Sequence, residues 1–232
     1  MSTRQAKATK ARIARPRLTR ERVLVEALRL IDDEGLDALT MRALGNRLGV
    51  EAMSIYNHVA DKAALRAGIV ELLWEELERS VEEGEDWRDS LRSLARRERA
   101  LATDHPNAFP LLMGASSWAE PMLRTLGRAL DVLRHAGFDD ERAAKILNTV
   151  LGYACGYATM EISYLGAGRS RLDGTDELEW FVEFARALPP GAPPELVRVA
   201  RDCCMLDPDE QFEFGLEALL AGLDPGCETW GA

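Results

Sequence analysis

Four side chains between residues 40 and 62 fall near expected helix ends and carry a hydroxyl, a phenol, an imidazole and an ammonium group: Thr40, Tyr56, His58 and Lys62. Such groups, together with the N–H groups at the start of a helix, suit the phosphate oxygens of a nucleic acid. The Tyr56 ring is also expected to pack in the core of a small domain. A purely structural role is the alternative for His58.

A second set of side chains lies where two short helices would face base edges: Arg42, Ala52, Met53, Ser54 and Asn57. An arginine can donate two hydrogen bonds to guanine O6 and N7, a contact worth about 1–3 kcal/mol of discrimination. Asn57 suits adenine, whereas Ala52 and Met53 suit thymine methyl groups. Glu51 is unfavourable beside a phosphate unless it caps the N-terminus of the second helix, where negative charge is favoured.

The elements that must position these residues have the pattern of a helix-turn-helix. Thr40 can cap a first helix, with Met41, Leu44 and Leu48 on one side. This helix is expected to end at Gly49, after which a second short helix begins. Two short helices joined by a turn that contains glycine are typical of the motif whose second helix enters the major groove of DNA. The pattern therefore predicts a DNA-binding protein.

The rest of the chain has helical periodicity and no convincing strand, so we predict an all-α fold of nine or ten helices. One helix is expected from Thr19 to about Glu34, and Asp61 is expected to cap another that runs to about Val81. Further helices are expected at about 87–103, 118–135, 139–165, 176–188, 194–204 and 208–223. We expect residues 108–116 to be irregular and residues 166–175 to form a loop.

The charge is divided unevenly along the chain. The formal net charge is −10, yet residues 1–66 carry 13 Lys and Arg against 8 Asp and Glu, and the remainder carries 16 against 31. This asymmetry fits an N-terminal end that faces DNA. Residues 1–18 are basic with almost no large apolar residue, so we expect a disordered arm. The arm either follows phosphates or a minor groove, or is only a solvated tail.

Several other classes of protein are not supported by the sequence. It contains no nucleophile elbow, P-loop or dinucleotide-binding motif, and its three histidines have no metal-ligand spacing. We therefore predict no catalytic residue, no metal site and no cofactor. Cys155, Cys203, Cys204 and Cys227 form no C-x-x-C pair, which favours a reduced, cytoplasmic setting. No apolar run reaches the roughly 20 residues that a membrane span needs.

Residues 19–66 resemble the TetR (tetracycline repressor) family of bacterial transcription factors. The resemblance is carried by Leu39-Thr40-x-Arg42, Leu48-Gly49-Val50-Glu51, Tyr56-x-His58-Val59 and Lys62. The C-terminal part resembles the tetracycline-repressor subgroup more loosely, through the long helix at 139–165 and the closing run at 212–216. The resemblance implies an arm (1–18), a three-helix helix-turn-helix DNA-binding domain (19–66), and a larger helical ligand-binding and dimerisation domain (67–232).

The family resemblance also implies a function and a mechanism. Members bind double-stranded operator DNA as homodimers, and most are repressors released by a hydrophobic or amphipathic small molecule. A ligand in the larger domain would shift the helix that begins at Asp61 and move the two recognition helices away from successive turns of DNA. A constitutive DNA-binding regulator is the alternative. The choice between a repressor and an activator rests on the family resemblance alone.

The chain departs from the tetracycline-repressor subgroup in two respects. The side chains at 52, 53 and 57 differ, so we expect a different operator. The residues that hold a metal–tetracycline complex in that subgroup have no clear counterpart here, so neither tetracycline nor magnesium is predicted.

The helix expected at 139–165 carries phenols and a thioether on one face: Tyr153, Tyr157, Met160 and Tyr164. Such a stripe either lines an adaptable ligand cavity or forms ordinary core. Glu161 lies beside it and either meets a cationic ligand or faces water. The residues expected to complete the cavity are His105, Phe109, Met113, Trp118 and Met122.

The neighbouring face of that helix carries small residues four apart, which would let another helix approach closely. Together with the apolar face of the last helix they predict a dimer interface of four helices about a two-fold axis. The residues expected in this interface are Gly152, Gly156, Phe212, Leu216 and Leu219. Packing within one chain is the alternative.

Overall fold

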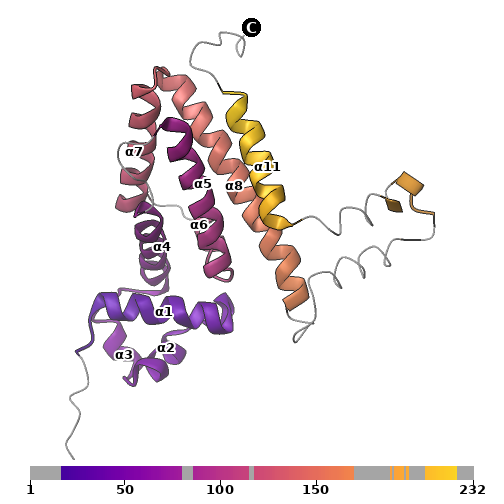
Figure 1. Cartoon of the computed structure of the whole chain (residues 1–232). Coiled ribbons are helices and arrows are strands. Elements are labelled where there is room, and N and C mark those ends of the chain that lie inside the picture. The colour runs from indigo at the N-terminus through magenta and orange to yellow at the C-terminus, as the bar shows by residue number, and fades with distance from the viewer. Residues whose placement is uncertain are drawn as a thin grey trace, which may run out of the picture.

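The computed structural model describes residues 17–79, 86–114, 118–169, 189, 191–195, 197–198 and 207–223, and these ranges contain helices and no strand. The α-helices are α1 (Arg20–Glu34), α2 (Met41–Leu48), α3 (Ala52–Ile55), α4 (Lys62–Glu78), α5 (Trp87–Asp104), α6 (Pro110–Met113), α7 (Glu120–His135), α8 (Asp140–Arg169) and α11 (Pro208–Ala221), with a 3₁₀ turn η1 (Leu36–Ala38). Helices α1–α3 form a small unit at one end, and α4 leads from it to the larger bundle of α5, α7, α8 and α11 (Figure 1). The predicted all-α fold is confirmed.

Short polar side chains start three of the N-terminal helices, as predicted. Thr19, Thr40 and Asp61 each accept a hydrogen bond from the backbone N–H three residues further on, at 3.2, 3.1 and 2.7 Å. Gly35 and Gly49 end α1 and α2 with φ of 86° and 67°. Positive φ is disfavoured for residues with a Cβ, so these glycines allow two sharp changes of direction.

Two further glycines lie inside helices, where neighbouring segments approach closely. A Cβ at Gly45 would lie 2.9 Å from the Val50 carbonyl oxygen and 3.3 Å from the Ala52 nitrogen, so the turn rests directly on the α2 backbone. A Cβ at Gly68 would lie 2.5 Å from the Leu24 side chain, where α4 crosses α1. Both contacts help to fix the orientation of α3 relative to α4.

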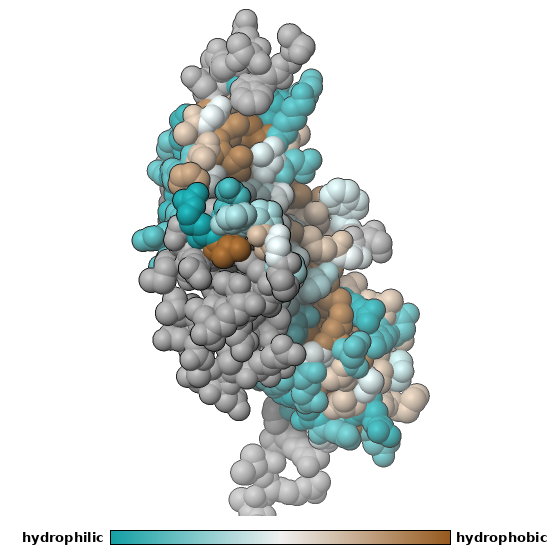
Figure 2. Space-filling view, turned by 90° about the vertical axis from the view of Figure 1, so that its right-hand side faces the viewer, coloured by the Kyte–Doolittle hydropathy of each residue, from teal (hydrophilic) through white to brown (hydrophobic). Residues whose placement is uncertain are grey.

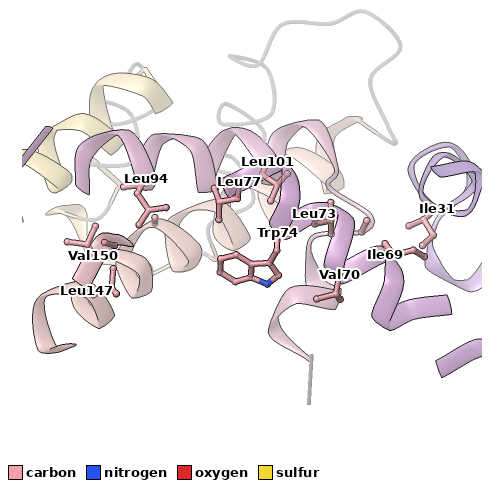
Figure 3. Packing of buried hydrophobic residues seen from close by; sticks show 14 of the residues in the cluster. Ile31, Ile69, Val70, Leu73, Trp74, Leu77, Leu94, Leu101, Leu147 and Val150 are labelled. Atoms are coloured by element: carbon pink, nitrogen blue, oxygen red, sulfur yellow. The ribbon is translucent and has the colours of Figure 1, made fainter. Parts of the chain in front are cut away.

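One hydrophobic cluster extends from the small unit into the larger bundle. Ile69 of α4 packs near Ile31 of α1, and further along α4 the side chains of Leu73 and Trp74 face the bundle, near Leu101 of α5 (Figure 3). The predicted domain boundary at residue 66 therefore falls inside a helix that both parts share. Across the described ranges, no helix combines the length and apolar character that a bilayer crossing requires.

The observed boundaries differ from the predicted ones in a few places. Residues 110–113 form α6 inside the segment expected to be irregular, because Pro110 in its first turn favours a helical start. Helix α8 continues to Arg169 instead of ending at 165, because Gly166 and Gly168 weaken a helix without forcing it to end. Helix α4 ends at Glu78 rather than near Val81.

Several predictions concern residues outside the described ranges. These are the basic arm through residue 16, the loop beyond residue 169, the helix at 176–188 and much of the helix at 194–204. The side chain of Tyr164 and residues Cys203, Cys204 and Cys227 also lie outside them.

Candidate DNA interface and ligand domain

The helix-turn-helix presents its predicted DNA-contacting residues at the surface. None of the nine side chains is buried, and Met53 and Tyr56 are 71% and 44% exposed. The expectation that the Tyr56 ring packs in the core is wrong. The core position is filled instead by its neighbour Ile55, which is fully buried, and by Val59. The phenol of Tyr56 is consequently available to a partner outside the chain.

Helix α2 carries two arginines in opposite settings. Arg47 lies 2.9 Å from Glu26 and 2.6 Å from Asp33, and these carboxylates fix α2 to α1. The hydrogen bond with Asp33, followed by that with Glu26, raises the pKa of the Arg47 guanidinium above its usual value. The Arg42 side chain is exposed, and no carboxylate in the described part of the chain lies within ion-pair distance of it. Of the two α2 arginines, only Arg42 keeps its guanidinium clear of carboxylates in the described part of the chain.

The N-terminal ends of α2 and α3 differ in how they are capped, which affects the predicted phosphate contacts. Thr40 Oγ1 already accepts the cap hydrogen bond from Ala43, which leaves its hydroxyl proton for an acceptor such as a phosphate oxygen. Glu51 occupies the N-cap position of α3, but its side chain makes no capping hydrogen bond. The Glu51 side chain therefore lies at the start of α3 but does not cap the helix.

The positive charge of the N-terminal end is located in the arm. Residues 1–18 contain six Lys and Arg and no acidic residue, whereas residues 19–66 contain seven Lys and Arg against eight Asp and Glu. The helix-turn-helix unit is thus nearly neutral overall. Its long-range attraction to DNA depends on where its charges lie and on the arm that precedes it.

His105, predicted as a ligand residue, joins the small unit to the larger bundle. Its Nδ1 lies 2.8 Å from Asp32 of α1 and its Nε2 lies 3.4 Å from Glu76 of α4. The Asn107 side chain donates a hydrogen bond of 3.0 Å to the Asp32 carbonyl oxygen. Burial raises the pKa of the Asp32 carboxyl. The imidazole therefore contacts α1 and α4 at their junction with the end of α5, and both its nitrogens face carboxylates.

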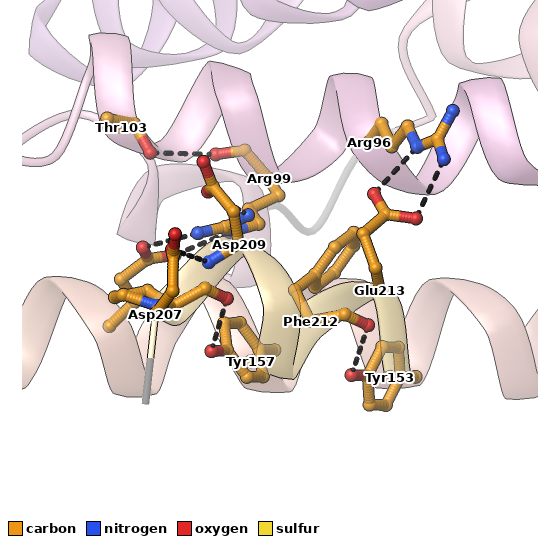
Figure 4. A network of polar contacts seen from close by, with 11 residues as sticks. Arg96, Arg99, Thr103, Tyr153, Tyr157, Asp207, Asp209, Phe212 and Glu213 are labelled. Carbon is orange, nitrogen blue, oxygen red and sulfur yellow. Dashed lines mark hydrogen bonds and ion pairs between the residues drawn. The ribbon is translucent and has the colours of Figure 1, made fainter. Parts of the chain in front are cut away.

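Two tyrosines of the predicted cavity stripe hold α11 against α8. Tyr153 and Tyr157 donate hydrogen bonds of 2.8 Å to the carbonyl oxygens of Phe212 and Pro208 (Figure 4). Their ring centroids lie 5.5 and 5.3 Å from that of Phe212. These two tyrosines therefore pack between helices of the same chain, which was the alternative to lining a ligand cavity. Met160, from the same stripe, is 48% exposed.

The structure supports neither alternative for Glu161. Its carboxylate does not face water, and its charge is not left unpaired for a cationic ligand. It receives two hydrogen bonds from Arg99, of 2.8 and 2.7 Å, and both side chains are largely buried. Arg99 also contacts Asp209 at 2.8 Å and lies 4.9 Å from the centroid of the Phe212 ring (Figure 4). This network joins α5, α8 and α11.

The other predicted cavity residues differ in how far they are buried. Phe109 is fully buried and Met122 packs on the main core, whereas Met113 and Trp118 are 56% and 72% exposed. Two surface hollows are open and lined by charged residues of α4, α5 and α7, and neither contains a predicted ligand residue. In the described ranges no group of His, Cys, Asp and Glu side chains is placed to hold a metal ion.

The sequence interpretation missed Glu98 of α5, which is only 6% exposed. Its Oε2 has no hydrogen-bond partner among the described residues, and burial raises the pKa of this carboxyl to about 8. The signal was present in the sequence, because Leu94, Leu101 and Ala102 are three or four residues away and define the buried face of a helix. Buried carboxyl groups in proteins usually have a hydrogen-bond partner, so an unsatisfied one is unusual.

The dimer prediction is corrected at two positions. Phe212 and Leu216 are fully buried within the chain, so neither side chain is available to a second copy. Gly152 and Gly156 do lie on the outside of α8, since a Cβ at either would meet nothing within 4 Å. Apolar residues reach the surface on the upper part of the face that carries α8 and α11 (Figure 2). Phe214 of α11 is 72% exposed and had not been predicted.

Two family models together match most of the chain. The model described as "Bacterial regulatory proteins, tetR family" matches residues 23–69. The model described as "Tetracyclin repressor-like, C-terminal domain" matches residues 81–225. Residues 70–80, which include the second half of α4, lie between the two matches.

Individual relatives are similar over nearly the whole chain. The HTH-type transcriptional repressor DrrR1 of Streptomyces coeruleorubidus is 27% identical over 219 residues, which cover 90% of this chain and 78% of that protein. The tetracycline repressor protein class A from transposon 1721 of Escherichia coli is 31% identical over 204 residues, which cover 87% and 88%. The crystal structure of the Streptomyces coelicolor TetR family protein ActR in complex with actinorhodin matches with a TM-score of 0.73 and 27% identity, covering 93% of this chain and 100% of that one.

Proposed function

Because the chain belongs to the TetR family of transcriptional regulators, we propose that it binds a two-fold-symmetric DNA operator as a homodimer and represses transcription until a small molecule releases it. The observation that carries the DNA-binding role is the contrast within α2, where Arg47 is held by carboxylates and Arg42 is not. Repression is supported by relatives named as repressors. Release by a ligand is supported by a relative solved in complex with actinorhodin.

We assign the exposed side chains of the helix-turn-helix to two tasks. Reading of base edges falls to Arg42 with Met53 and Asn57, which are exposed on α2 and around α3, and to the half-buried Ala52 and Ser54. Phosphate contacts fall to Thr40, Tyr56, His58 and Lys62. The closely packed turn at Gly45 fixes α3 against α2, so all nine groups approach DNA as one rigid surface.

Helix α4 is positioned to connect the ligand to the DNA. Gly68 packs against α1, and Glu78 near the other end receives hydrogen bonds of 2.7 and 2.9 Å from Arg124 of α7. His105 adds a contact from the end of α5 to both α1 and α4. A ligand that displaces α4 relative to α7 would carry α1–α3 with it. The two recognition helices would then no longer match sites one DNA turn apart, roughly 34–36 Å.

Nearly complete release sets a requirement on the ligand. To change a population from mostly bound to mostly released, the ligand must favour the released state by roughly 10⁴-fold, or about 5.5 kcal/mol. The dimer that makes this coupling effective is proposed to form through the outer face of α8 at Gly152 and Gly156, with Leu219 and Phe214 of α11. Two glycines one helical turn apart on this face would let the partner helix approach closely.

Selection of binding sites from a random pool of double-stranded DNA, at near-physiological salt, tests the proposal. The expected product is a two-fold-symmetric consensus with half-sites about one DNA turn apart. A folded protein that enriches no sequence contradicts sequence-specific binding. Fluorescence anisotropy on the consensus then provides a release assay for small molecules. A regulator that no compound ever releases would instead be a constitutive one.

A further inference from the structure

Helix α11 packs on both α8 and α5 of the bundle (Figure 1). Three of its acidic side chains, four residues apart, pair with three arginines of α5. These pairs are Arg99 with Asp209 at 2.8 Å, Arg96 with Glu213 at 2.7 Å and Arg92 with Glu217 at 2.6 Å. The buried apolar side chains of α11 are also four residues apart: Phe212, Leu216 and Leu220. Both sets of contacts therefore repeat about once per helical turn.

Such a repeating face does not by itself define the register of α11, the level at which it lies along its neighbours. A slide of one turn, about 5.4 Å, would exchange residues four positions apart. Arg96 would then face Glu217 or Asp209, and apolar residues would again face the core. The hydroxyls of Tyr153 and Tyr157 bind backbone carbonyl oxygens, which every residue supplies. Most of these contacts could therefore form again after a slide.

Gly215 is the exception, because its neighbour leaves no room for a side chain. A Cβ at this position would lie 2.7 Å from Cζ and 2.9 Å from Cε2 of Tyr153. The Tyr153 ring is held in place by its 2.8 Å hydrogen bond to the Phe212 carbonyl oxygen and by stacking on the Phe212 ring, with centroids 5.5 Å apart (Figure 4). A slide of one turn would place Gln211 or Leu219 opposite this ring, and each carries a Cβ. Of these three registers, only the observed one has a glycine there.

We propose that Gly215 and Tyr153 together fix the register of α11, and that the repeating contacts around them supply stability without defining the register. This register is a property of a single chain and does not depend on DNA binding. Its consequence for the dimer rests on the proposed function. Phe214 is 72% exposed next to Gly215, so a slide of one turn would move it by about 5.4 Å across the proposed interface. The pair thus positions the surface through which two copies would meet.

Removal of the Tyr153 ring tests the register directly. Leucine methyl groups of the full-length protein are isotope-labelled, and Leu216 and Leu220 are followed by NMR. Tyr153→Ala should give a second set of signals from α11, or broadening by exchange, because more than one register is then open to the helix. Tyr153→Phe keeps the ring and should give the single set of the wild type.

Tyr157→Ala is the matched control for that experiment. It also removes a hydrogen bond to the α11 backbone and a ring that packs against Phe212. The nearest contacts of Gly215, however, all come from Tyr153. Tyr157→Ala should therefore lower stability and still give one set of signals. Two sets in this control would show that the packing on Phe212, and not Gly215, fixes the register.

A second test adds the missing Cβ. Alanine is the better helix former, so Gly→Ala inside a helix usually stabilises a protein where space allows. Gly127→Ala in α7, where a Cβ meets nothing within 4 Å, should keep or raise the thermal midpoint. Gly215→Ala should lower the midpoint by at least about 2 °C. This loss should disappear in the Tyr153→Ala background, because the ring that blocks the Cβ is gone.

Two results would overturn the proposal outright. One is a single, wild-type set of signals in Tyr153→Ala, and the other is a Gly215→Ala variant as stable as Gly127→Ala. Circular dichroism verifies that each variant is folded, and if Tyr153→Ala is not, the comparison of the two Gly→Ala variants decides alone. The proposed function fails separately, if the random DNA pool yields no consensus.

Discussion

The recognition unit and the larger bundle use their polar side chains in opposite ways. In α1–α3 the predicted functional residues remain at the surface, and of the two α2 arginines only Arg47 is held by carboxylates of α1. In the bundle three of the predicted ligand residues are engaged within the chain, since Tyr153 and Tyr157 bind the α11 backbone and Glu161 binds Arg99. A motif of fixed spacing therefore defines an outer surface, whereas a stripe on a long helix defines a face without saying what covers it.

The largest expected effect tests whether Glu98 is truly without a partner in the bundle. Its pKa of about 8 in the folded protein lies above the ordinary 4.5, so between these values the folded state binds the extra proton. The contribution of Glu98 to the free energy of unfolding should therefore be fully present below about pH 4.5 and be lost as the pH rises towards about 8, by at most roughly 1.4 kcal/mol per pH unit. Urea unfolding of the wild type and Glu98→Gln across this range should give curves that diverge in favour of the variant. Parallel curves would mean that Glu98 is satisfied in solution.

The second effect compares two arginines of α5 that make similar ion pairs at different depths. Arg99→Ala leaves the buried Glu161 carboxylate unpaired and should lower the free energy of unfolding by about 3 kcal/mol. Arg96 pairs with Glu213 but is 51% exposed, so Arg96→Ala should cost less than about 1 kcal/mol. Both values follow from chemical denaturation. Equal losses would show that depth does not separate the two pairs.

The third effect compares the two arginines of α2 and concerns DNA. Arg42→Ala should weaken operator binding by about 1–3 kcal/mol and relax the base preference at one position in each half-site. Arg47→Ala should leave the base preference intact and lower thermal stability, because its ion pairs with α1 are lost. Site selection and thermal unfolding of both variants measure this. An unchanged preference in Arg42→Ala would remove that residue from base reading.

The smallest effect compares one tyrosine from each region, with the same atom deleted. Tyr153→Phe removes the hydrogen bond to Phe212 and should cost about 1 kcal/mol of unfolding free energy without changing DNA affinity. Tyr56→Phe should weaken DNA binding by a similar amount, about 1 kcal/mol, and leave stability unchanged. A loss of stability in Tyr56→Phe would mean that its phenol has an internal role.

Local rules accounted for most of the helices near the N-terminus. The hydroxyls of Thr19 and Thr40 and the carboxylate of Asp61 satisfy backbone groups within three residues, so the sequence alone locates these helix starts. The exposed positions of the recognition unit followed from the same short-range geometry, apart from Tyr56, whose ring was expected in the core. The motif that carries the family resemblance also lies in this region, and the family models confirm it.

Long-range packing explains what the sequence did not predict. Phe212 and Leu216 are apolar at helical spacing, which a dimer interface and a chain's own core satisfy equally well. The direction of Tyr153 depends on where α11 lies, and α11 is more than forty residues away along the chain. Only the tertiary structure shows that Gly152 and Gly156 of α8 face outward, whereas Tyr153 and Tyr157 contact α11.

The close contact between Gly68 and Leu24 limits how this regulator can be recombined with its relatives. A chimera joined at residue 66 would take Leu24 from one parent and the α4 position opposite it from the other. A donor with a side chain at that position would bring a Cβ to 2.5 Å from a methyl group of Leu24, so the Leu24 side chain would have to shift. When a new DNA specificity is grafted, transferring α1 and the first half of α4 together keeps this pair of residues matched.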